Sequence, residues 1–276
     1  MDEQQANNEG AIELNKSQFG REAAKYVTSR IHSNQEDLNF VLKIINPQDY
    51  WECLDIATGA GHLAHIIAQS TKHVIASDIT PQMLNETAKL AEDKKISNIS
   101  FEEIDVHSIP YEDNKFDLVT SRIAPHHFYD ISLAISEMIR VTKPGGFVFI
   151  EDTVAPENVI AGKLFNKIEI LRDPSHKNDL SESEWKNIFT SNDCEIVSIT
   201  KREKEWPLKW WTERMSTPSN NVEKIIHLLE NNHYQFKDEI GIIQLTKDYD
   251  QNWPLDRKIE SWKLIPNNIY LLARKE

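Results

Sequence analysis

Short apolar runs alternate with amphipathic segments through the middle of the chain. The apolar runs have the length of buried strands and lie at residues 53–57, 74–77, 99–104, 116–120 and 147–150. Segments with helical spacing of apolar residues separate them, at residues 63–69, 81–94 and 131–141. This alternation predicts an α/β fold, a doubly wound, mostly parallel sheet of seven strands with helices on both faces.

Helical spacing also covers two segments before this region, 21–31 and 36–45. Residues 1–16 are polar and lack periodicity, so we expect a mobile tail there. A less regular part follows residue 151, with a helix at 159–171, a capped helix from Ser181, a strand at 195–200, a helix at 221–231, and strands at 239–246 and 258–273.

No internal repeat or flexible linker divides the chain, so we expect a single domain over residues 17–276. Its expected parts are an N-terminal helical lid at 17–46, a ligand-binding core at 50–152, and a cap inserted after the fifth strand with C-terminal strands at 153–276.

Turn and cap residues support these boundaries. Thr80 precedes Pro81, a proline at the first helical position, where a missing N–H costs nothing. The run from Lys143 to Gly146 is expected to end one helix and lead into the next strand. Ser181 and Glu184 have the spacing of a capping box.

Composition limits the classes of partner. Lys and Arg number 31 against 44 Asp and Glu, a formal net charge of −13, which disfavours nucleic acid. No run approaches the ~20 apolar residues of a membrane span, and the N-terminus lacks the pattern of a signal peptide. We therefore expect a cytoplasmic protein with a small-molecule partner. Cys53 and Cys194 are expected to be buried thiols.

A glycine loop follows the first strand of the alternating region and is the clearest local signal for a ligand site. Gly59 and Gly61 allow a tight turn and close approach of a ligand, at the sheet edge where α/β proteins bind ligands. With Ala64 they also fit a dinucleotide pattern, which leaves a nicotinamide-dependent oxidoreductase open. Asp55 disfavours that alternative, because its carboxylate would repel a pyrophosphate and attract an ammonium or sulfonium group.

Two further acids follow neighbouring strands, and we expect them at the same edge of the sheet. Asp78 is placed to accept hydrogen bonds from ribose hydroxyls, and Asp105 to accept one from an adenine amino group. Ile79 and Met83 would supply apolar faces around the base. The alternative is that these acids solvate strand ends or cap helices.

Residues 19–150 resemble a class I S-adenosylmethionine-dependent methyltransferase of the type 11, or ubiquinone-biosynthesis-like, group with a Rossmann-like fold. The resemblance is carried by these motifs in order: Asp55-x-x-x-Gly59-x-Gly61, Asp78, Asp105-Val106, Phe116-Asp117 and Arg140-Val141-Thr142-Lys143-Pro144-Gly145-Gly146. The chain departs from the family pattern at Ala57 and Thr58, where a further small residue is usual.

The resemblance implies S-adenosylmethionine as cofactor and gives residues their roles. Asp55, Gly59 and Gly61 would hold the methionine end; Asp78 the ribose; Ile79, Asp105 and Val106 the adenine; and Ser121 would border the sulfonium. Ala57, Thr58 and Met83 are also expected to contact the cofactor. In similar proteins the first helices cover the cofactor, which makes Tyr26 and His32 lid candidates, with ordinary helix packing as the alternative.

The acceptor side is expected to follow the fourth and fifth strands. His126 and His127 are candidates for proton transfer or acceptor contact, with a structural hydrogen bond as the alternative. Adjacent histidines seldom bind one ion, so no metal site is expected. Further candidate acceptor contacts are Asp152, Asp173, His176 and Arg214. The expected function is methyl transfer to a small molecule; a non-catalytic S-adenosylmethionine-binding protein is the other alternative.

Overall fold

The computed structural model describes residues 3–27 and 33–276, with side chains at 7–20 and 33–276. The chain divides into two compact units. The first comprises Met1–Asp152, Lys186–Thr200 and Tyr270–Glu276, and the second comprises Thr153–Trp185 and Lys201–Ile269. The chain passes from one unit to the other several times along its sequence. The single domain over residues 17–276 stays a prediction.

A seven-stranded sheet has the order β3-β2-β1-β4-β5-β10-β6. Its strands are β1 (Glu52–Ile56), β2 (His73–Asp78), β3 (Ile99–Glu103), β4 (Phe116–Arg122), β5 (Thr142–Val154), β6 (Cys194–Glu203) and β10 (Asn267–Lys275). β1 pairs in parallel with both β2 and β4, so the order of the strands reverses at β1. In doubly wound sheets ligands bind at this reversal, outside the carboxyl ends of the strands. The predicted fold class is confirmed.

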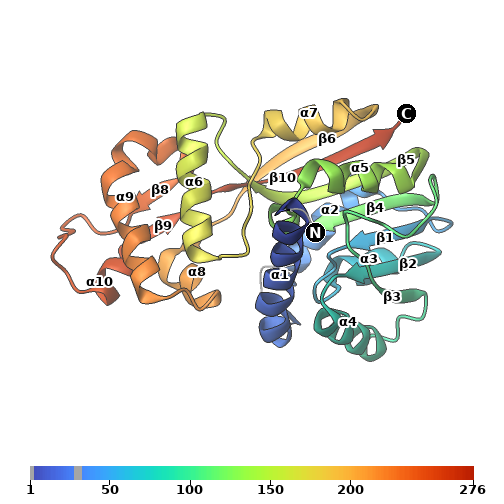
Figure 1. The fold of residues 1–276 in the computed structure, drawn as a ribbon, viewed down its shortest axis with the longest axis horizontal. Coiled ribbons are helices and arrows are strands. Elements are labelled where there is room, and N and C mark those ends of the chain that lie inside the picture. The colour runs from blue at the N-terminus through green and yellow to red at the C-terminus, as the bar shows by residue number, and fades with distance from the viewer. Residues whose placement is uncertain (1–2, 28–32) are drawn as a thin grey trace. The chain divides into compact units, whose positions relative to one another are not determined.

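Helices pack against the sheet of the first unit (Figure 1). They are α1 (Glu3–Val27), α2 (Gln35–Ile45), α3 (His62–Ala68), α4 (Pro81–Asp93), α5 (Ile131–Val141) and the 3-10 turn η1 (Pro125–His127). Buried side chains from helices and strands form one apolar cluster, for example Val41 of α2, Ile67 of α3 and Leu118 of β4. As predicted, α4 has Thr80 at its N-cap and Pro81 in its first turn.

The second unit contains helices α6 (Val159–Arg172), α8 (Leu208–Arg214), α9 (Ser219–Ile240) and α10 (Leu255–Ile259), and the start of α7 (Glu182–Thr190). Its antiparallel sheet has the order β7-β9-β8, with β7 (Trp206–Pro207), β8 (Ile242–Gln244) and β9 (Trp262–Leu264). In Figure 1, α6 and α9 lie side by side. Phe165, Trp211 and Trp262 are among the large side chains of its core.

The predicted capping box is confirmed at the start of α7. The backbone N of Ser181 donates to Glu184 Oε2 at 2.7 Å, and the backbone N of Glu184 donates to Ser181 Oγ at 3.3 Å. The two predicted buried thiols are also confirmed, since Cys53 and Cys194 are free and buried. Among the described residues, none of the helices has the length and apolar character needed to cross a bilayer.

Some predicted elements differ from the structure. Residues 3–16 belong to α1 instead of a tail, because helix-forming residues there pack onto the first unit through buried Ala11, without an apolar repeat of their own. The strand predicted at 239–246 is shorter in the structure, where β8 covers only Ile242–Gln244. Helix α9 continues to Ile240 and is capped by Gly241 in a left-handed conformation. The strand predicted at 258–273 is interrupted at Pro266, which cannot donate to a ladder.

Candidate functional site

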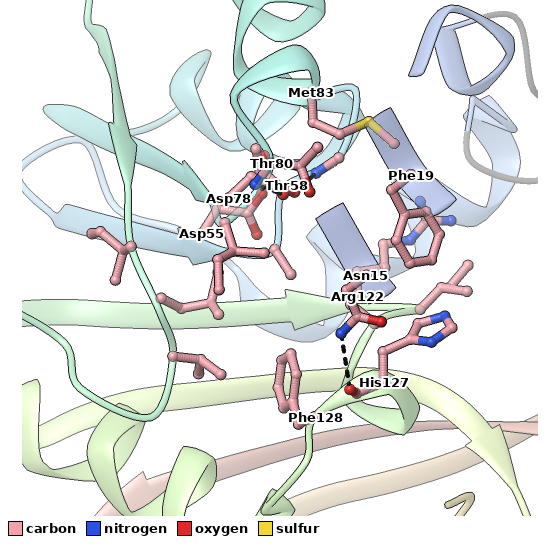
Figure 2. Close-up of a pocket in the computed structure, with 18 of the residues that line it drawn as sticks. Asn15, Phe19, Asp55, Thr58, Asp78, Thr80, Met83, Arg122, His127 and Phe128 are labelled. Atoms are coloured by element: carbon pink, nitrogen blue, oxygen red, sulfur yellow. Dashed lines mark hydrogen bonds between the residues drawn. The ribbon is translucent and has the colours of Figure 1, made fainter. Parts of the chain in front are cut away.

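A cavity in the first unit opens at the carboxyl ends of β1 to β4. It encloses about 1040 Å³ of empty space, counting solvent at its mouth. The wall includes most of the predicted cofactor residues, namely Asp55, Ala57, Thr58, Gly59, Asp78, Ile79, Met83, Asp105 and Val106 (Figure 2). The structure therefore brings the three strand-end aspartates into one cavity.

Asp55, near the end of β1, is a buried carboxylate with hydroxyl donors. Its Oδ1 accepts a hydrogen bond from Thr120 Oγ1 at 2.5 Å, and its Oδ2 accepts one from Thr58 Oγ1 at 2.6 Å. Burial raises the pKa of Asp55 to about 6, in spite of these two hydrogen bonds and nearby Arg122. A cationic ligand would stabilise the charged form, so Asp55 suits an ammonium or sulfonium group.

Asp78, the last residue of β2, holds the glycine loop. Its Oδ2 accepts from the backbone N of Gly59 at 3.0 Å, and its Oδ1 accepts from the backbone N of Thr80 at 2.9 Å. Burial raises the pKa of Asp78 above its ordinary value. Gly59 has φ +57°, and a Cβ built there would meet no atom within 4 Å. The bare backbone of Gly59 is therefore open to a ligand.

Gly61 has a different reason to be glycine. It does not line the cavity, and its φ is +76°. A Cβ there would lie 2.3 Å from Thr87 Cγ2 and 2.9 Å from His65 Cε1. The second glycine of the loop thus permits close packing of α3 and α4 behind it, where the sequence suggested ligand approach.

Asp105 lies beyond the end of β3 and is hydrogen-bonded to His107, a cavity residue that the sequence did not indicate. Its Oδ1 accepts from the backbone N and from Nδ1 of His107, at 3.0 and 2.7 Å. Burial raises the pKa of Asp105, but the His107 hydrogen bonds outweigh burial and hold it below its ordinary value. The His107 ring stacks on Tyr129 with centroids 3.5 Å apart, and both residues line the cavity.

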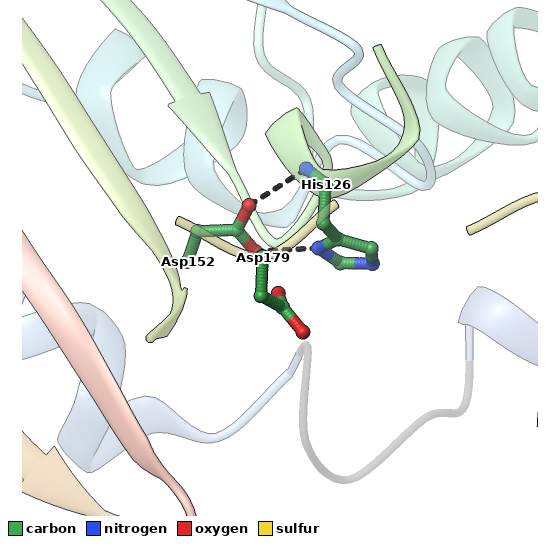
Figure 3. A group of neighbouring side chains, drawn as sticks. All are labelled: His126, Asp152 and Asp179. Atoms are coloured by element: carbon green, nitrogen blue, oxygen red, sulfur yellow. Dashed lines mark hydrogen bonds and ion pairs between the residues drawn. The ribbon is translucent and has the colours of Figure 1, made fainter. Parts of the chain in front are cut away.

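The two adjacent histidines of η1 lie in different surroundings. His127 lines the cavity, and its ring meets the edge of Phe19 with centroids 4.9 Å apart. His126 does not line it. Its Nδ1 and backbone N donate to the two carboxylate oxygens of buried Asp152, at 2.6 and 2.8 Å (Figure 3). Of the two candidates, the structure brings only His127 to the cavity.

Helix α1 contributes part of the cavity wall: Phe19 lies in the N-terminal helical segment expected at 17–46, whereas Ile12 and Asn15 lie in the segment expected to be a tail. Ile12, Asn15 and Phe19 line the cavity, and Asn15 Nδ2 donates to the His127 carbonyl at 3.3 Å (Figure 2). The named lid candidates stay predictions: the side chain of Tyr26 and the whole of His32 lie outside the described residues. No local pattern in the sequence marks Ile12 and Asn15 as cavity residues.

The remaining predicted residues are not among those that line the cavity. Ser121 is buried inside β4, and the next residue, Arg122, lines the cavity instead while pairing with Glu151 at 2.5 Å. Of the other acceptor candidates, Asp152 belongs to the first unit, and Asp173, His176 and Arg214 belong to the second. There Asp173 Oδ1 accepts from Ser175, His176 Nε2 bonds with Asn166 Oδ1, and the Arg214 guanidinium lies over the Trp210 ring.

Comparison with known families gives the class of protein. A family model described as a methyltransferase domain matches residues 49–208. YcgJ of Bacillus subtilis strain 168, an uncharacterized methyltransferase, is 31% identical over 228 residues, which cover 83% of this chain and 90% of YcgJ. The chain therefore belongs to this methyltransferase family.

Solved structures and a further relative agree with this assignment. The YcgJ crystal structure matches with a TM-score of 0.77 and 27% identity over 87% of this chain and 98% of YcgJ. BH2331 of Bacillus halodurans C-125 matches with a TM-score of 0.79 and 26% identity over 87% and 99%. The ubiquinone/menaquinone biosynthesis C-methyltransferase UbiE of Saccharophagus degradans is 30% identical over 131 residues, 46% of this chain and 53% of UbiE.

These findings confirm the resemblance drawn from the motifs. The methyl donor of the family is S-adenosylmethionine, so this protein is an S-adenosylmethionine-dependent methyltransferase. This assignment replaces the nicotinamide-dependent oxidoreductase, which the glycine loop left open, and the non-catalytic S-adenosylmethionine-binding protein, which was the other alternative.

Proposed function

We propose that the protein transfers the methyl group of S-adenosylmethionine to a small-molecule acceptor, with the cofactor held in the cavity of the first unit. The observation that carries this proposal is the convergence of Asp55, Asp78 and Asp105 with the open Gly59 backbone on one cavity that also reaches His127.

The donors and acceptors of the cavity fit the parts of the cofactor. The buried Asp55 carboxylate has hydroxyl partners and suits the cationic methionine end. Asp78 receives one backbone hydrogen bond on each oxygen, and the remaining lone pairs suit ribose hydroxyls. The second oxygen of Asp105 makes no hydrogen bond to a residue that the structure describes, so it suits an adenine amino group. Ile79 and Val106 would contact the faces of the base.

The protein's own part in catalysis is alignment and exclusion of water. When bound, the cofactor would supply a methyl group on a sulfonium: the acceptor nucleophile would bond to the methyl carbon in line as the carbon–sulfur bond breaks, and S-adenosylhomocysteine would leave as a neutral thioether. Holding reactants about 3–3.5 Å apart can account for ~7–11 kcal/mol of a barrier. Phe19, Ile12 and Phe128 give the cavity an apolar wall that excludes water.

We assign the acceptor-facing role to His127 in preference to His126. The His127 ring is at the cavity, where it can accept a proton or a hydrogen bond from an acceptor. His126 instead donates Nδ1–H to buried Asp152, a contact that favours a structural role. Asp152, Asp173, His176 and Arg214 stay predicted acceptor contacts.

The acceptor is proposed only as a class. The name of the Saccharophagus relative refers to ubiquinone and menaquinone biosynthesis, but its similarity covers less than half of this chain. A small molecule is favoured over nucleic acid by the net charge of −13.

Binding and transfer test the proposal separately. In calorimetric titration, S-adenosylhomocysteine should bind the wild-type protein, and lack of binding at high micromolar concentration would refute the cofactor site. Incubation with methyl-labelled cofactor and a whole-cell extract that contains metabolites, nucleic acid and protein should give a labelled small molecule. Label found only on nucleic acid or protein would overturn the acceptor class.

A further inference from the structure

Thr87 lies behind the glycine loop, on the buried side of α4 and outside the cavity wall. It is fully buried. Its Oγ1 donates to the Gly59 carbonyl at 2.6 Å and lies 3.0 Å from the Met83 carbonyl one turn earlier on the helix. Its methyl carbon occupies the space that a Cβ on Gly61 would need. One side chain thus contacts both glycines of the loop.

The Thr87 hydroxyl completes the anchoring of Gly59. The backbone N of Gly59 donates to Asp78 Oδ2, and its carbonyl accepts from Thr87 Oγ1. Both peptide planes that flank Gly59 are therefore fixed by side chains from neighbouring elements. The fixed backbone is the part of the loop that is open to the cavity.

His65 on α3 supports Thr87 from the other side. The Thr87 carbonyl can only accept, so His65 Nε2 must carry the proton of their 3.1 Å hydrogen bond. Burial lowers the pKa of His65 to about 4, so its ring is neutral near pH 7. The ring also borders the space beside Gly61, which leaves the loop little room to move.

We infer that Thr87 is a positioning residue for the methyl donor: its hydroxyl, by holding the Gly59 carbonyl, presets the glycine loop in the conformation that binds the cofactor. This inference rests on the proposed function, because the loop must contact the cofactor for its geometry to matter. Thr87 lies outside the cavity wall, so it acts on the cofactor only through Gly59, whose backbone N is hydrogen-bonded to Asp78.

Substitutions at position 87 can separate the hydroxyl from the methyl group. Thr87→Ser keeps the hydroxyl and removes the methyl, and Thr87→Ala removes both, so these two variants differ only in the hydroxyl. Thr87→Val keeps the shape and removes the hydroxyl. We expect Thr87→Ala and Thr87→Val to weaken S-adenosylhomocysteine binding about tenfold in calorimetry, and Thr87→Ser to stay within about threefold of wild type. The KM for S-adenosylmethionine should rise in the same order, with kcat changed less.

Each outcome decides a different point. Equal affinity of Thr87→Ala and wild type overturns the inference, and so does a Thr87→Ser variant as weak as Thr87→Ala, since packing of the methyl would then explain the effect. Circular dichroism and thermal melting establish that each variant is folded. If Thr87→Val does not fold, the Ser and Ala variants still decide. Failure of the wild-type protein to bind would instead refute the proposed function.

Discussion

At the scale of single residues, Asp55 links ligand binding to pH. Its pKa is raised from 3.8 to about 6 by burial, so the free protein carries a neutral Asp55 below that pH. A cationic ligand must then displace a proton. We expect affinity for S-adenosylhomocysteine, whose amino group is charged, to be constant above about pH 7 and to fall roughly tenfold by pH 5. Calorimetry across this range checks the prediction.

The Asp55→Asn variant is the control for that pH dependence. It should bind more weakly at pH 7.5 and lose most of the decline at low pH. The pKa of Asp55 is about 6 in the folded protein and 3.8 for an ordinary aspartate, so the folded state binds its proton more tightly than the unfolded state does. The free energy of unfolding therefore falls as pH rises from about 4 to 6 and Asp55 becomes charged. The unliganded variant should therefore melt at a higher temperature than wild type near pH 7. An unchanged pH profile in Asp55→Asn would assign the titration to another group.

Asp78 gives a second prediction about a single residue, on the affinity for S-adenosylhomocysteine. Its carboxylate anchors Gly59 and Thr80 and is proposed to accept ribose hydroxyls. Asp78→Ala should weaken S-adenosylhomocysteine binding by more than ~1 kcal/mol, because hydrogen bonds to charged groups contribute ~1.5–3 kcal/mol. Asp93→Ala, which removes an exposed carboxylate at the end of α4, is the matched control. Affinity equal to that of the control would show that the ribose is held elsewhere.

At the scale of elements, helix α1 supplies part of the cavity wall from a segment that precedes the alternating strands and helices. Phe19 lines the cavity and meets His127 edge to face. Phe19→Ala should weaken S-adenosylhomocysteine binding about threefold to tenfold, since an aromatic pair contributes ~0.5–1.5 kcal/mol beyond its buried area. Stopped-flow dissociation should show the loss as faster release. Leu14→Ala, on the exposed side of the same helix, should have wild-type rates, and equal effects of both would argue against a wall at Phe19.

The capping box at the start of helix α7 is expected to stabilise the folded protein. Ser181 and Glu184 satisfy each other's backbone N–H groups. Ser181→Ala should lower the free energy of unfolding in urea by about 1 kcal/mol, the usual loss for an N-cap hydroxyl. Ser191→Ala, at an exposed position just after this helix, should change it by less than ~0.5 kcal/mol. Equal values for the two variants would contradict a stabilising cap.

The elements of the core could be predicted because their signals are local. Periodicity and turn residues place β1, β2 and α4 within a residue or two of the structure. The strand-end aspartates follow from the same reasoning, since parallel strands end at one edge. In contrast, α1 owes its position to tertiary packing, and no local pattern shows that Phe19 reaches His127. The difference between His126 and His127 depends on the geometry of a single 3-10 turn.

At the scale of the whole molecule, the cofactor-binding sheet depends on both ends of the chain. Residues Lys186–Thr200 and Tyr270–Glu276 belong to the first unit, although the second unit's residues lie between them in sequence. β10 lies beside β5 in the sheet order, and its Tyr270 and Leu272 are buried in the core of the first unit. The core predicted at residues 50–152 therefore accounts for β1 to β4 and most of β5, and β6 and β10 come from the part at 153–276, where C-terminal strands are predicted.

The charge of the whole molecule argues for the class of acceptor. With 31 basic and 44 acidic residues, the net charge of −13 repels phosphate backbones over long range. Proteins that bind nucleic acid without sequence preference do so with Kd values of ~10⁻⁴–10⁻⁶ M and a strong dependence on salt. We expect no binding of duplex DNA or structured RNA in fluorescence anisotropy at 50 μM protein and low salt, with or without S-adenosylhomocysteine. Binding that weakens steeply with added salt would contradict a small-molecule acceptor and direct the search to nucleic acid.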